Sequence, residues 1–297
     1  MTIPDFFLIG APKCGTTSLA LWLEEHPQVF MCALKEPFFF CTDIKAYRPV
    51  RTWQEYCRLF DSARGVLAVG EASTSYLRSR VAVPAILRVS PEARFTVCLR
   101  NPVDMIASVH AQMVRGVRED VRDLRTALAL ESTRRRGNHL PKRTIEPKDL
   151  IYSDTCALGS QLARLYDMVD PARVHLIFMD DLSINPRKVW ADLQIFLGVS
   201  DDGRTEFTTE NARAAPRSVT ATRLIGSLHQ VKNRVIPGRS LGIGAGLRKA
   251  LERPPNVAET TMPAALRADL VQRFEGEIDI LERLTGRDLS AWREEAA

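Results

Sequence analysis

Near its start the chain has an apolar run that leads directly into a turn rich in glycine and hydroxyl residues. Residues Phe6–Ile9 are all apolar, and Gly10–Ser18 follow as Gly-Ala-Pro-Lys-Cys-Gly-Thr-Thr-Ser. This order predicts a buried strand, a tight turn and the start of a helix. Backbone N–H groups at a helix N-terminus carry partial positive charge, and Lys13 and the hydroxyls add further donors. The segment therefore predicts a βα unit whose turn binds an anion such as phosphate or sulfate.

Short apolar runs bounded by turns recur along the chain, and segments with helical spacing follow them. The expected strands are Asp5–Ile9, Val29–Cys32, Val66–Val69, Phe95–Leu99 and Val174–Met179. The expected helices are Gly15–His26, Pro102–Gly116, Thr155–Val169, Pro186–Leu197 and Ala265–Leu284. This alternation predicts an α/β fold with a central parallel sheet flanked by helices, whose strands all end at one edge. We expect one domain over residues 1–297, because a chain of this length can bury a single core.

Composition limits the class of partner. The 297-residue chain has a formal net charge of +5, which favours an anionic ligand. This charge is lower than is typical of nucleic-acid-binding proteins, so we expect a small anionic cofactor and no DNA or RNA. The six cysteines show no C-x-x-C pair and no zinc-ligand spacing, which predicts reduced thiols and no metal site. Because the sequence has neither a secretory signal pattern nor an apolar run of spanning length, we expect a cytoplasmic protein with no membrane span.

Two segments interrupt the alternation of strands and helices. Residues 118–150 are strongly basic and include the cluster Arg134–Arg136, and residues 200–262 are rich in arginine, glycine and proline. Such segments are typical of loops or lids that vary with the substrate.

The turn near the start differs from the nucleotide-binding pattern G-x-x-x-x-G-K-[ST]. Gly10 and Gly15 have the required separation, but Thr16 stands where that pattern has lysine. An ordinary ATP site is therefore disfavoured. Residues Val174–Asp181 nevertheless form an apolar run that ends in two aspartates, as in the magnesium-binding strand of P-loop enzymes. A Mg-dependent nucleotide kinase stays an alternative.

Residues Pro12–Leu19 resemble the 5′-phosphosulfate-binding loop of sulfotransferases that use 3′-phosphoadenosine 5′-phosphosulfate (PAPS), especially the heparan sulfate type and its bacterial relatives. The resemblance implies a P-loop-like domain in which this turn binds the sulfated end of the donor. The binding residues that it implies are Lys13, Cys14, Gly15, Thr16, Thr17 and Ser18.

A second matching segment runs from Phe95 to Ser108 and resembles the family's 3′-phosphate site. There, an arginine at the end of a strand and a serine eight positions later bind one phosphate, which implies this role for Arg100 and Ser108. The guanidinium fork of Arg100 suits a phosphate, and Ser108 lies about two turns into the expected helix. Further candidates for this pocket, or for a solvated basic loop, are Asn211, Arg213 and Arg217.

The segment Lys35–Phe40 reads Lys-Glu-Pro-Phe-Phe-Phe. In the sulfotransferases that it resembles, an acidic residue followed by an aromatic pair stands here, which implies that Glu36 is the catalytic base. Lys13 would stabilise the charge that develops on the transferred group. Taken without the other two motifs, a surface Glu36 paired with Lys35 is the preferred interpretation.

Residues Gly70–Leu77 resemble the Gly-Glu-x-Ser/Thr stretch of the same family, with one departure. The heparan sulfate enzymes commonly have lysine after the glutamate, whereas this chain has Ala72, so that second cation is missing. Glu71 is either a buried structural acid or an active-site residue. His110 either contacts substrate or is a solvated or packed histidine.

The function that the resemblance implies is transfer of a sulfuryl group from PAPS to a hydroxyl or, as second choice, an amine. The reaction would be an in-line displacement with Glu36 as the base and no metal. The acceptor would be a small molecule, a glycan or a lipid, selected by residues 118–150 and 200–262. A noncatalytic protein that binds polyanions through its arginine-rich loops is the alternative outside enzymes.

Overall fold

The computed structural model describes residues 2–44, 48–208, 215–216, 252–253 and 262–294. The strands of the main sheet are β1 (Phe6–Gly10), β2 (Val29–Met31), β3 (Ala68–Ala72), β4 (Arg94–Leu99) and β5 (Val174–Phe178). Their order is β2-β3-β1-β4-β5, and every neighbouring pair is parallel, so all strands end at the same edge. This confirms the predicted central parallel sheet. The third strand is wrong in its bounds: it was predicted over Val66–Val69 and runs from Ala68 to Ala72, and Leu67 before it is 61% exposed.

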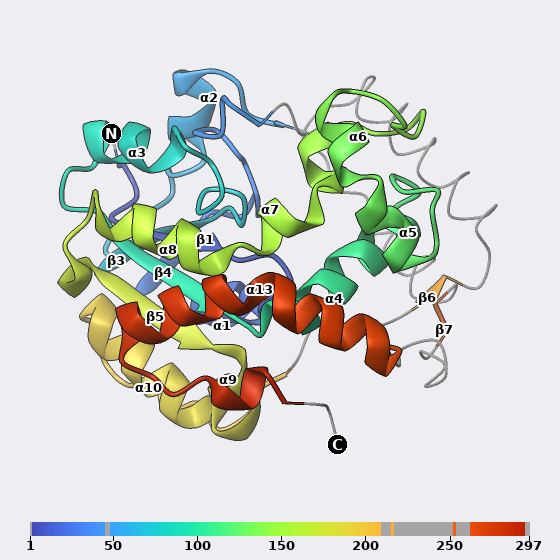
Figure 1. Ribbon diagram of the computed structural model, residues 1–297. Helices are drawn as coiled ribbons and strands as arrows, with labels where there is room; N and C mark the ends of the chain where they lie inside the picture. Colours follow the sequence, from blue (N-terminus) through green and yellow to red (C-terminus); the bar gives the residue numbers. More distant parts are fainter. Residues whose placement is uncertain (1, 45–47, 209–214, 217–251, 254–261, 295–297) are drawn as a thin grey trace.

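Helices flank this sheet, with α8 and α13 in front of it in Figure 1. The helices are α1 (Thr16–Glu24), α2 (Trp53–Arg58), α3 (Ala82–Val89), α4 (Pro102–Arg115), α5 (Leu124–Ala129), α6 (Glu131–Arg135), α7 (Tyr152–Cys156), α8 (Leu158–Tyr166), α9 (Met179–Ile184), α10 (Pro186–Leu197) and α13 (Ala264–Thr285). Short 3₁₀ turns cover Pro147–Leu150, Pro171–Arg173 and Ser290–Trp292. The strands β6 (Ala215–Pro216) and β7 (Glu252–Arg253) form a separate antiparallel pair.

Several helices begin and end where the sequence predicted. The helix α10 has the predicted bounds, since Asn185 caps its first turn and Gly198, with φ 70°, ends it. The helix α4 begins at Pro102. The side chain of Asn101 caps it by accepting a hydrogen bond from the N–H of Val103 at 2.9 Å. The single helix expected over Thr155–Val169 is wrong. The structure has α7 and α8 there, because the backbone is not helical at Ala157.

The core is built around β1, which has no solvent-exposed residue. Phe6, Phe7, Leu8 and Ile9 are all 0% exposed, as expected for a strand covered on both faces of a parallel sheet. Phe7 stacks on Phe95 of β4, with ring centroids 6.0 Å apart. This packing fixes the strand whose end carries the predicted anion-binding turn.

The basic segment 118–150, predicted as a loop or lid, is helical over part of its length. It contains α5, α6 and the 3₁₀ turn Pro147–Leu150. Glu119 and Arg134 form a fully buried ion pair through two hydrogen bonds of 2.7 and 2.8 Å, and Tyr152 donates a third bond to Glu119 at 2.8 Å. The segment is therefore folded onto α7 by buried polar contacts.

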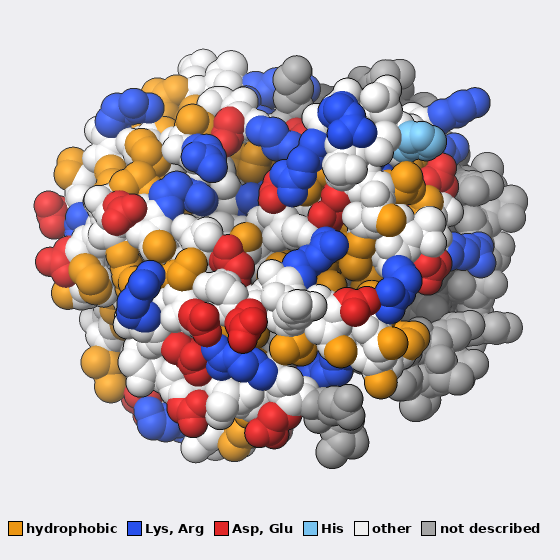
Figure 2. Space-filling view, in the orientation of Figure 1, with side chains coloured by type: hydrophobic (Ala, Val, Ile, Leu, Met, Phe, Trp, Pro, Cys, Tyr) orange, Lys and Arg blue, Asp and Glu red, His pale blue; other side chains and the backbone are white. Residues whose placement is uncertain are grey.

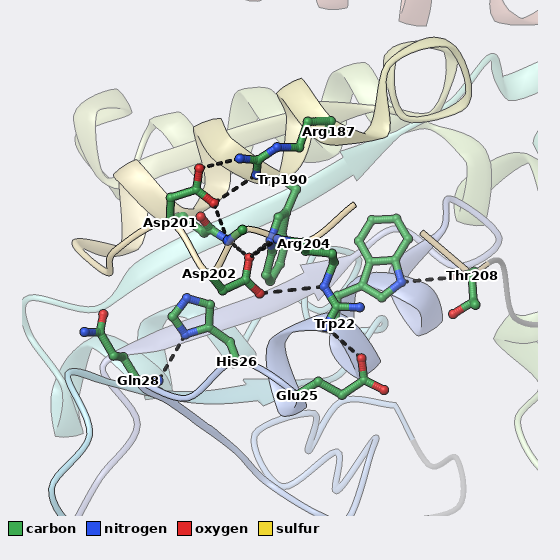
Figure 3. Close-up of polar contacts among 12 residues, drawn as sticks. Trp22, Glu25, His26, Gln28, Arg187, Trp190, Asp201, Asp202, Arg204 and Thr208 are labelled. Atoms are coloured by element: carbon green, nitrogen blue, oxygen red, sulfur yellow. Dashed lines mark hydrogen bonds and ion pairs between the residues drawn. The ribbon is translucent and has the colours of Figure 1, made fainter. Parts of the chain in front are cut away.

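The second variable segment is described only at its start and in short pieces. Figure 3 shows how residues 201–208 are held on α1 and α10. The indole N–H of Trp22 donates to the backbone oxygen of Thr208 at 3.2 Å, and Asp202 accepts from the indole N–H of Trp190 at 2.8 Å. Residues Asn211, Arg213 and Arg217 lie outside the described residues.

All six cysteines are free and buried. Over the ranges that the structure describes, none of the helices has the length and apolar character needed to cross a lipid bilayer.

Candidate active site

The turn between β1 and α1 requires glycine at two positions. Gly10 and Gly15 have φ values of 153° and 82°, a region that residues with a side chain seldom adopt. A Cβ at Gly15 would also lie 2.8 Å from a methyl carbon of Leu182. Gly15 is the N-cap residue of α1 and supplies no side-chain cap. No N-cap side chain therefore covers the start of α1, and the partial positive charge of such a helix N-terminus favours an anion.

Positive charge converges on Lys13 at this turn. Burial lowers the pKa of the Lys13 ammonium, and the nearby charges of Arg115, Arg100 and Lys35 lower it further. The shift means that its surroundings disfavour the charged form of Lys13. An anion bound here would be attracted by all of these cations and would offset this effect.

The remaining residues of the predicted loop differ in what they can offer a ligand. Cys14 is fully buried against Met105, and burial raises the pKa of its thiol to about 12, so only its backbone N–H can serve an anion. The side chains of Thr16 and Ser18 are also largely buried, at 4% and 5% exposure. Thr17 is half-buried at the start of α1.

Arg100, which was predicted to bind a second anionic group, lies beside the Lys13 turn. It directly follows β4, and its Nη1 donates to the backbone oxygen of Lys13 at 3.2 Å. A guanidinium has five N–H donors, so others remain for a phosphate. Ser108 is half-buried on α4. In the part of the chain that the structure describes, no hydrogen bond joins Ser108 to Arg100 or to the turn.

Glu36 lies in a strap, Lys35–Phe40, that runs beside the end of β3. Its backbone N–H donates to the oxygen of Ala72 at 2.8 Å. Its carboxylate Oε1 accepts from the hydroxyl of Thr74 at 2.8 Å and from Lys35 Nζ at 3.4 Å, and its side chain is 35% exposed. Since β3 pairs with β1, and Lys35 is near enough to lower the pKa of Lys13, the strap and the turn share one edge of the sheet.

Glu71 is a buried acid directly beneath this strap. Its side chain is 0% exposed, and its carboxylate accepts from the hydroxyls of Tyr56 and Ser73 at 2.6 Å each and of Tyr76 at 3.2 Å. Burial raises the pKa of Glu71 to about 7, although the three hydroxyl donors act against it. Of the two alternatives left by the sequence, the structure supports a buried structural acid.

Thr74 and Arg115 lie at the site but were not among the residues predicted from the sequence. The hydroxyl of Thr74 donates to the Glu36 carboxylate. The sequence pattern that could have pointed to Thr74 is the hydroxyl-rich stretch that follows Glu71. Arg115 is the last residue of α4, and it is one of the cations that lower the pKa of Lys13. No local pattern identified it, because its approach to Lys13 depends on how α4 packs.

His110, on α4, packs against the insertion and α7. Its Nε2 lies 2.8 Å from the backbone oxygen of Val121, and its ring meets the Tyr152 ring edge-on with centroids 5.4 Å apart. Burial lowers the pKa of His110, although the contact with Val121 opposes this. Of the two alternatives left by the sequence, the structure supports packing.

The two aspartates that suggested a magnesium site are engaged by the C-terminal segment. Asp180 accepts from the indole N–H of Trp292 at 2.7 Å, and Asp181 accepts two hydrogen bonds from Arg287. Within the described ranges, no group of three or more His, Cys, Asp or Glu side chains is arranged to hold a metal ion. These contacts give both aspartates a role in holding the fold together.

Comparison with solved structures relates the fold to other proteins. A sulfotransferase from Alicyclobacillus acidocaldarius superposes with a TM-score of 0.73 and 28% sequence identity, over 99% of this chain and 100% of that chain. The mouse sulfotransferase SULT7A1, solved in complex with PAP, shares the fold with a TM-score of 0.51 and 12% identity, over 96% of this chain and 89% of its own.

Comparison of sequences gives more limited matches to curated proteins. Human carbohydrate sulfotransferase 15 is 30% identical over 36% of this chain, and the membrane-associated sulfotransferase kil1 of Dictyostelium discoideum is 26% identical over 35%. The matched part spans only 26% and 22% of the length of these two relatives. The family model of the sulfotransferase domain, in contrast, matches residues 3–233, which is most of the chain. On this match, and on the fold that carries the Lys13 turn, the chain belongs to the sulfotransferase domain family.

Proposed function

We propose that the protein transfers a sulfuryl group from PAPS to the hydroxyl of an acceptor. The observation that carries this proposal is the contact of Arg100 with the Lys13 turn at the start of α1, where no side chain caps the helix: Arg100 Nη1 donates to the backbone oxygen of Lys13 at 3.2 Å. Burial lowers the pKa of Lys13, and the charges of Arg115 and Arg100 lower it further. A sulfated nucleotide has anionic groups at two ends, and the Lys13 turn with Arg100 beside it offers donors for both.

The chemistry assigned to the site is an in-line displacement at sulfur. The acceptor oxygen forms a bond to sulfur, its proton moves to the Glu36 carboxylate, and the bond to the bridging phosphate oxygen breaks. Adenosine 3′,5′-bisphosphate (PAP) leaves with that electron pair. Lys13 and the N–H groups of residues 14–18 stabilise the negative charge on the sulfuryl and departing oxygens. Arg100 and Ser108 hold the 3′-phosphate, so that binding energy far from sulfur positions the donor.

A carbohydrate hydroxyl is the acceptor class that we favour, with lipid and other small-molecule hydroxyls next and an amine last. Support for a carbohydrate comes from the name of one relative, carbohydrate sulfotransferase 15. We further propose that the reaction needs no metal, because Lys13 and its cationic neighbours supply the positive field. Cytoplasmic residence is proposed from the six free, buried cysteines.

Calorimetric titration tests the donor site, and transfer of labelled sulfate from PAPS tests the activity. We expect PAP to bind at a saturable site, more tightly than AMP and than ATP with Mg²⁺. The acceptor panel would contain an oligosaccharide, a phenol, a long-chain alcohol and a serine peptide. Binding of ATP with Mg²⁺ in preference to PAP, and activity abolished by a chelator, would instead indicate a kinase.

Replacing the proposed base separates chemistry from binding. We expect Glu36→Gln to lower kcat by about 10²–10⁴-fold, because the acceptor proton loses its receiver, while the affinity for PAP is unchanged. The matched control is Glu24→Gln, which removes an exposed carboxylate at the far end of α1. Full turnover by Glu36→Gln would show that another group is the base.

A further inference from the structure

The strap that carries Glu36 rests on two hydroxyls that point at one buried acid. The backbone N–H of Phe38 donates to Ser73 Oγ at 3.2 Å, and that of Phe40 donates to the Tyr76 hydroxyl at 3.4 Å. Both hydroxyls in turn donate to the Glu71 carboxylate, at 2.6 and 3.2 Å. Two parallel chains of hydrogen bonds therefore run from the strap to Glu71.

The direction of these bonds depends on Glu71 being an acceptor. A hydroxyl has one hydrogen to donate and lone pairs with which to accept. As long as the carboxylate takes the hydrogens of Ser73 and Tyr76, their oxygens present lone pairs to the strap N–H groups. An uncharged amide at position 71 would offer N–H donors of its own to the same oxygens, in competition with Phe38 and Phe40.

The strap has an unusual backbone that external contacts must hold. Glu36 and Phe38 have positive φ values of 64° and 49°, which residues with a side chain adopt at a cost. Besides the two N–H contacts, the guanidinium of Arg48 donates to the backbone oxygens of Phe38 at 3.2 Å and of Phe39 at 2.7 Å. The direction of the Glu36 side chain follows from this backbone, so a shift of the strap would move the carboxylate.

We propose that Glu71 is a positioning residue for Glu36, acting through Ser73 and Tyr76 on the backbone of residues 36–40. The inference rests on the proposed function for the role of Glu36 as base. Glu71 itself contacts no reacting group, because it is fully buried beneath the strap. Its carboxylate sets which way two hydroxyls donate, and through them it holds the strap in the conformation that presents Glu36.

Amide hydrogen exchange of the peptide containing Phe38–Phe40 tests the first link. We expect this peptide to exchange about 5- to 10-fold faster in Glu71→Gln and in Tyr76→Phe, because each weakens a bond to a strap N–H. The matched control is Tyr56→Phe. The Tyr56 hydroxyl also donates to Glu71 but accepts from neither strap N–H, and its ring still stacks on Phe39 with centroids 4.6 Å apart. Strap exchange in this variant should equal that of the parent.

A double-mutant cycle tests the second link, from strap to base. We expect Glu71→Gln to lower kcat by about 10- to 100-fold with PAP affinity unchanged, since a small displacement of a catalytic group is costly. In a Glu36→Gln background the same substitution should lower kcat by less than about threefold, because there is no base left to misplace. A merely structural role for Glu71 would lower kcat equally in both backgrounds.

The outcomes keep this inference apart from the proposed function. If the parent protein binds no PAP and transfers no sulfuryl group, the proposed function is wrong, and strap exchange alone decides whether Glu71 holds the strap. Strap exchange that is unchanged in Glu71→Gln overturns the inference. It is also overturned if the kcat loss of Glu71→Gln persists in full in the Glu36→Gln background.

Discussion

Basic side chains have different surroundings in the Lys13 turn and in the insertion over residues 118–150. In the insertion, Arg134 is paired with Glu119 inside the fold, and the half-exposed Arg135 forms two hydrogen bonds with Asp154. At the Lys13 turn, the neighbours that act most strongly on the ammonium are cations, and the hydrogen bond from Arg100 goes to a backbone oxygen. A cluster of arginines in a sequence therefore does not by itself locate an anion-binding site.

The two regions differ in the groups that the arginines contact: Arg134 and Arg135 each pair with an acid, whereas Arg100 donates to a backbone oxygen and lowers the pKa of Lys13. Figure 2 shows lysine and arginine side chains interspersed with aspartate and glutamate over the face that carries α13. One such contact is Arg273 of α13 with Glu131 of the insertion, at 3.4 Å. Balanced charges of this kind hold elements together, whereas a concentration of like charge is held in place by the fold and favours a ligand of opposite sign.

The largest effect is expected from loss of Glu119, the buried acid of the insertion. We expect Glu119→Ala to lower the free energy of unfolding by about 3–5 kcal/mol, because it leaves the Arg134 charge buried without a partner. PAP affinity of the folded fraction should not change. Chemical denaturation and calorimetry measure the two quantities, and a variant of unchanged stability would contradict the role given to this pair.

The pH dependence of stability is a second test of the Glu119–Arg134 ion pair. Burial by itself would raise the pKa of Glu119, but hydrogen bonds from Arg134, the Val121 N–H and Tyr152 outweigh it and lower the pKa. A carboxylate with a lowered pKa stabilises the fold above its ordinary pKa of about 4.5, and this stability is lost as the pH falls through the folded-state value. Glu119→Gln combined with Arg134→Met should therefore lose less stability than the parent between about pH 5 and pH 2.

At the Lys13 turn we expect the opposite: a large loss of activity and PAP affinity with no loss of stability. Lys13→Ala should lower kcat by about 10²–10³-fold and weaken PAP binding, because it removes a cation aimed at the transferred group. Its thermal unfolding temperature should stay the same or rise, since burial and like charges hold the pKa of Lys13 down. Differential scanning calorimetry with and without PAP checks both halves. A clear loss of stability without PAP would mean that Lys13 holds the fold.

Those two regions also differ in how much the sequence could predict. The strand Phe6–Gly10, the turn and the place of Arg100 follow from local order: an apolar run, glycines at fixed positions and a strand-end arginine. Local chemistry dictates such elements, so β1 and the start of α1 were predicted to within one residue, whereas β3 is shifted from its predicted place. The helices α5 and α6 are only 6 and 5 residues long, and helices this short depend on tertiary contacts such as the one between Glu119 and Arg134.

Long-range contacts explain what was missed in the candidate site. Glu71 could be named from its motif, but its tyrosine partners Tyr56 and Tyr76 come from opposite sides of it in the sequence. Thr74 reaches Glu36 across 38 positions of the chain. Such contacts form only when the strap folds over β3, and no periodic pattern in a single sequence predicts them.

A smaller effect, on nucleotide affinity, is expected at Arg100, the residue proposed to bind the 3′-phosphate. Arg100→Ala should weaken PAP binding by about 10- to 100-fold, as expected for loss of a charge-assisted pair of hydrogen bonds, while AMP binding changes little. The preference for a 3′-phosphate is the quantity to compare, by titration of both nucleotides into parent and variant. Arg94→Ala is the control: Arg94 begins the same strand but pairs with Asp5 at 2.8 Å. Equal losses for the two nucleotides would place Arg100 at the 5′ end.

The smallest effect is expected where the sequence is most basic. Replacing Arg135 and Arg136 together by alanine should change the free energy of unfolding by less than about 1 kcal/mol, because exposed pairs such as Arg135–Asp154 contribute little. PAP affinity should stay within about twofold of the parent, since Asp154 already balances the charge of Arg135. Retention on a heparin column distinguishes the alternatives: a protein whose function is to bind polyanions through this cluster would lose most of its salt-dependent retention. In a sulfotransferase whose ligand is held at Lys13, the same substitution leaves both PAP binding and turnover with a small acceptor intact.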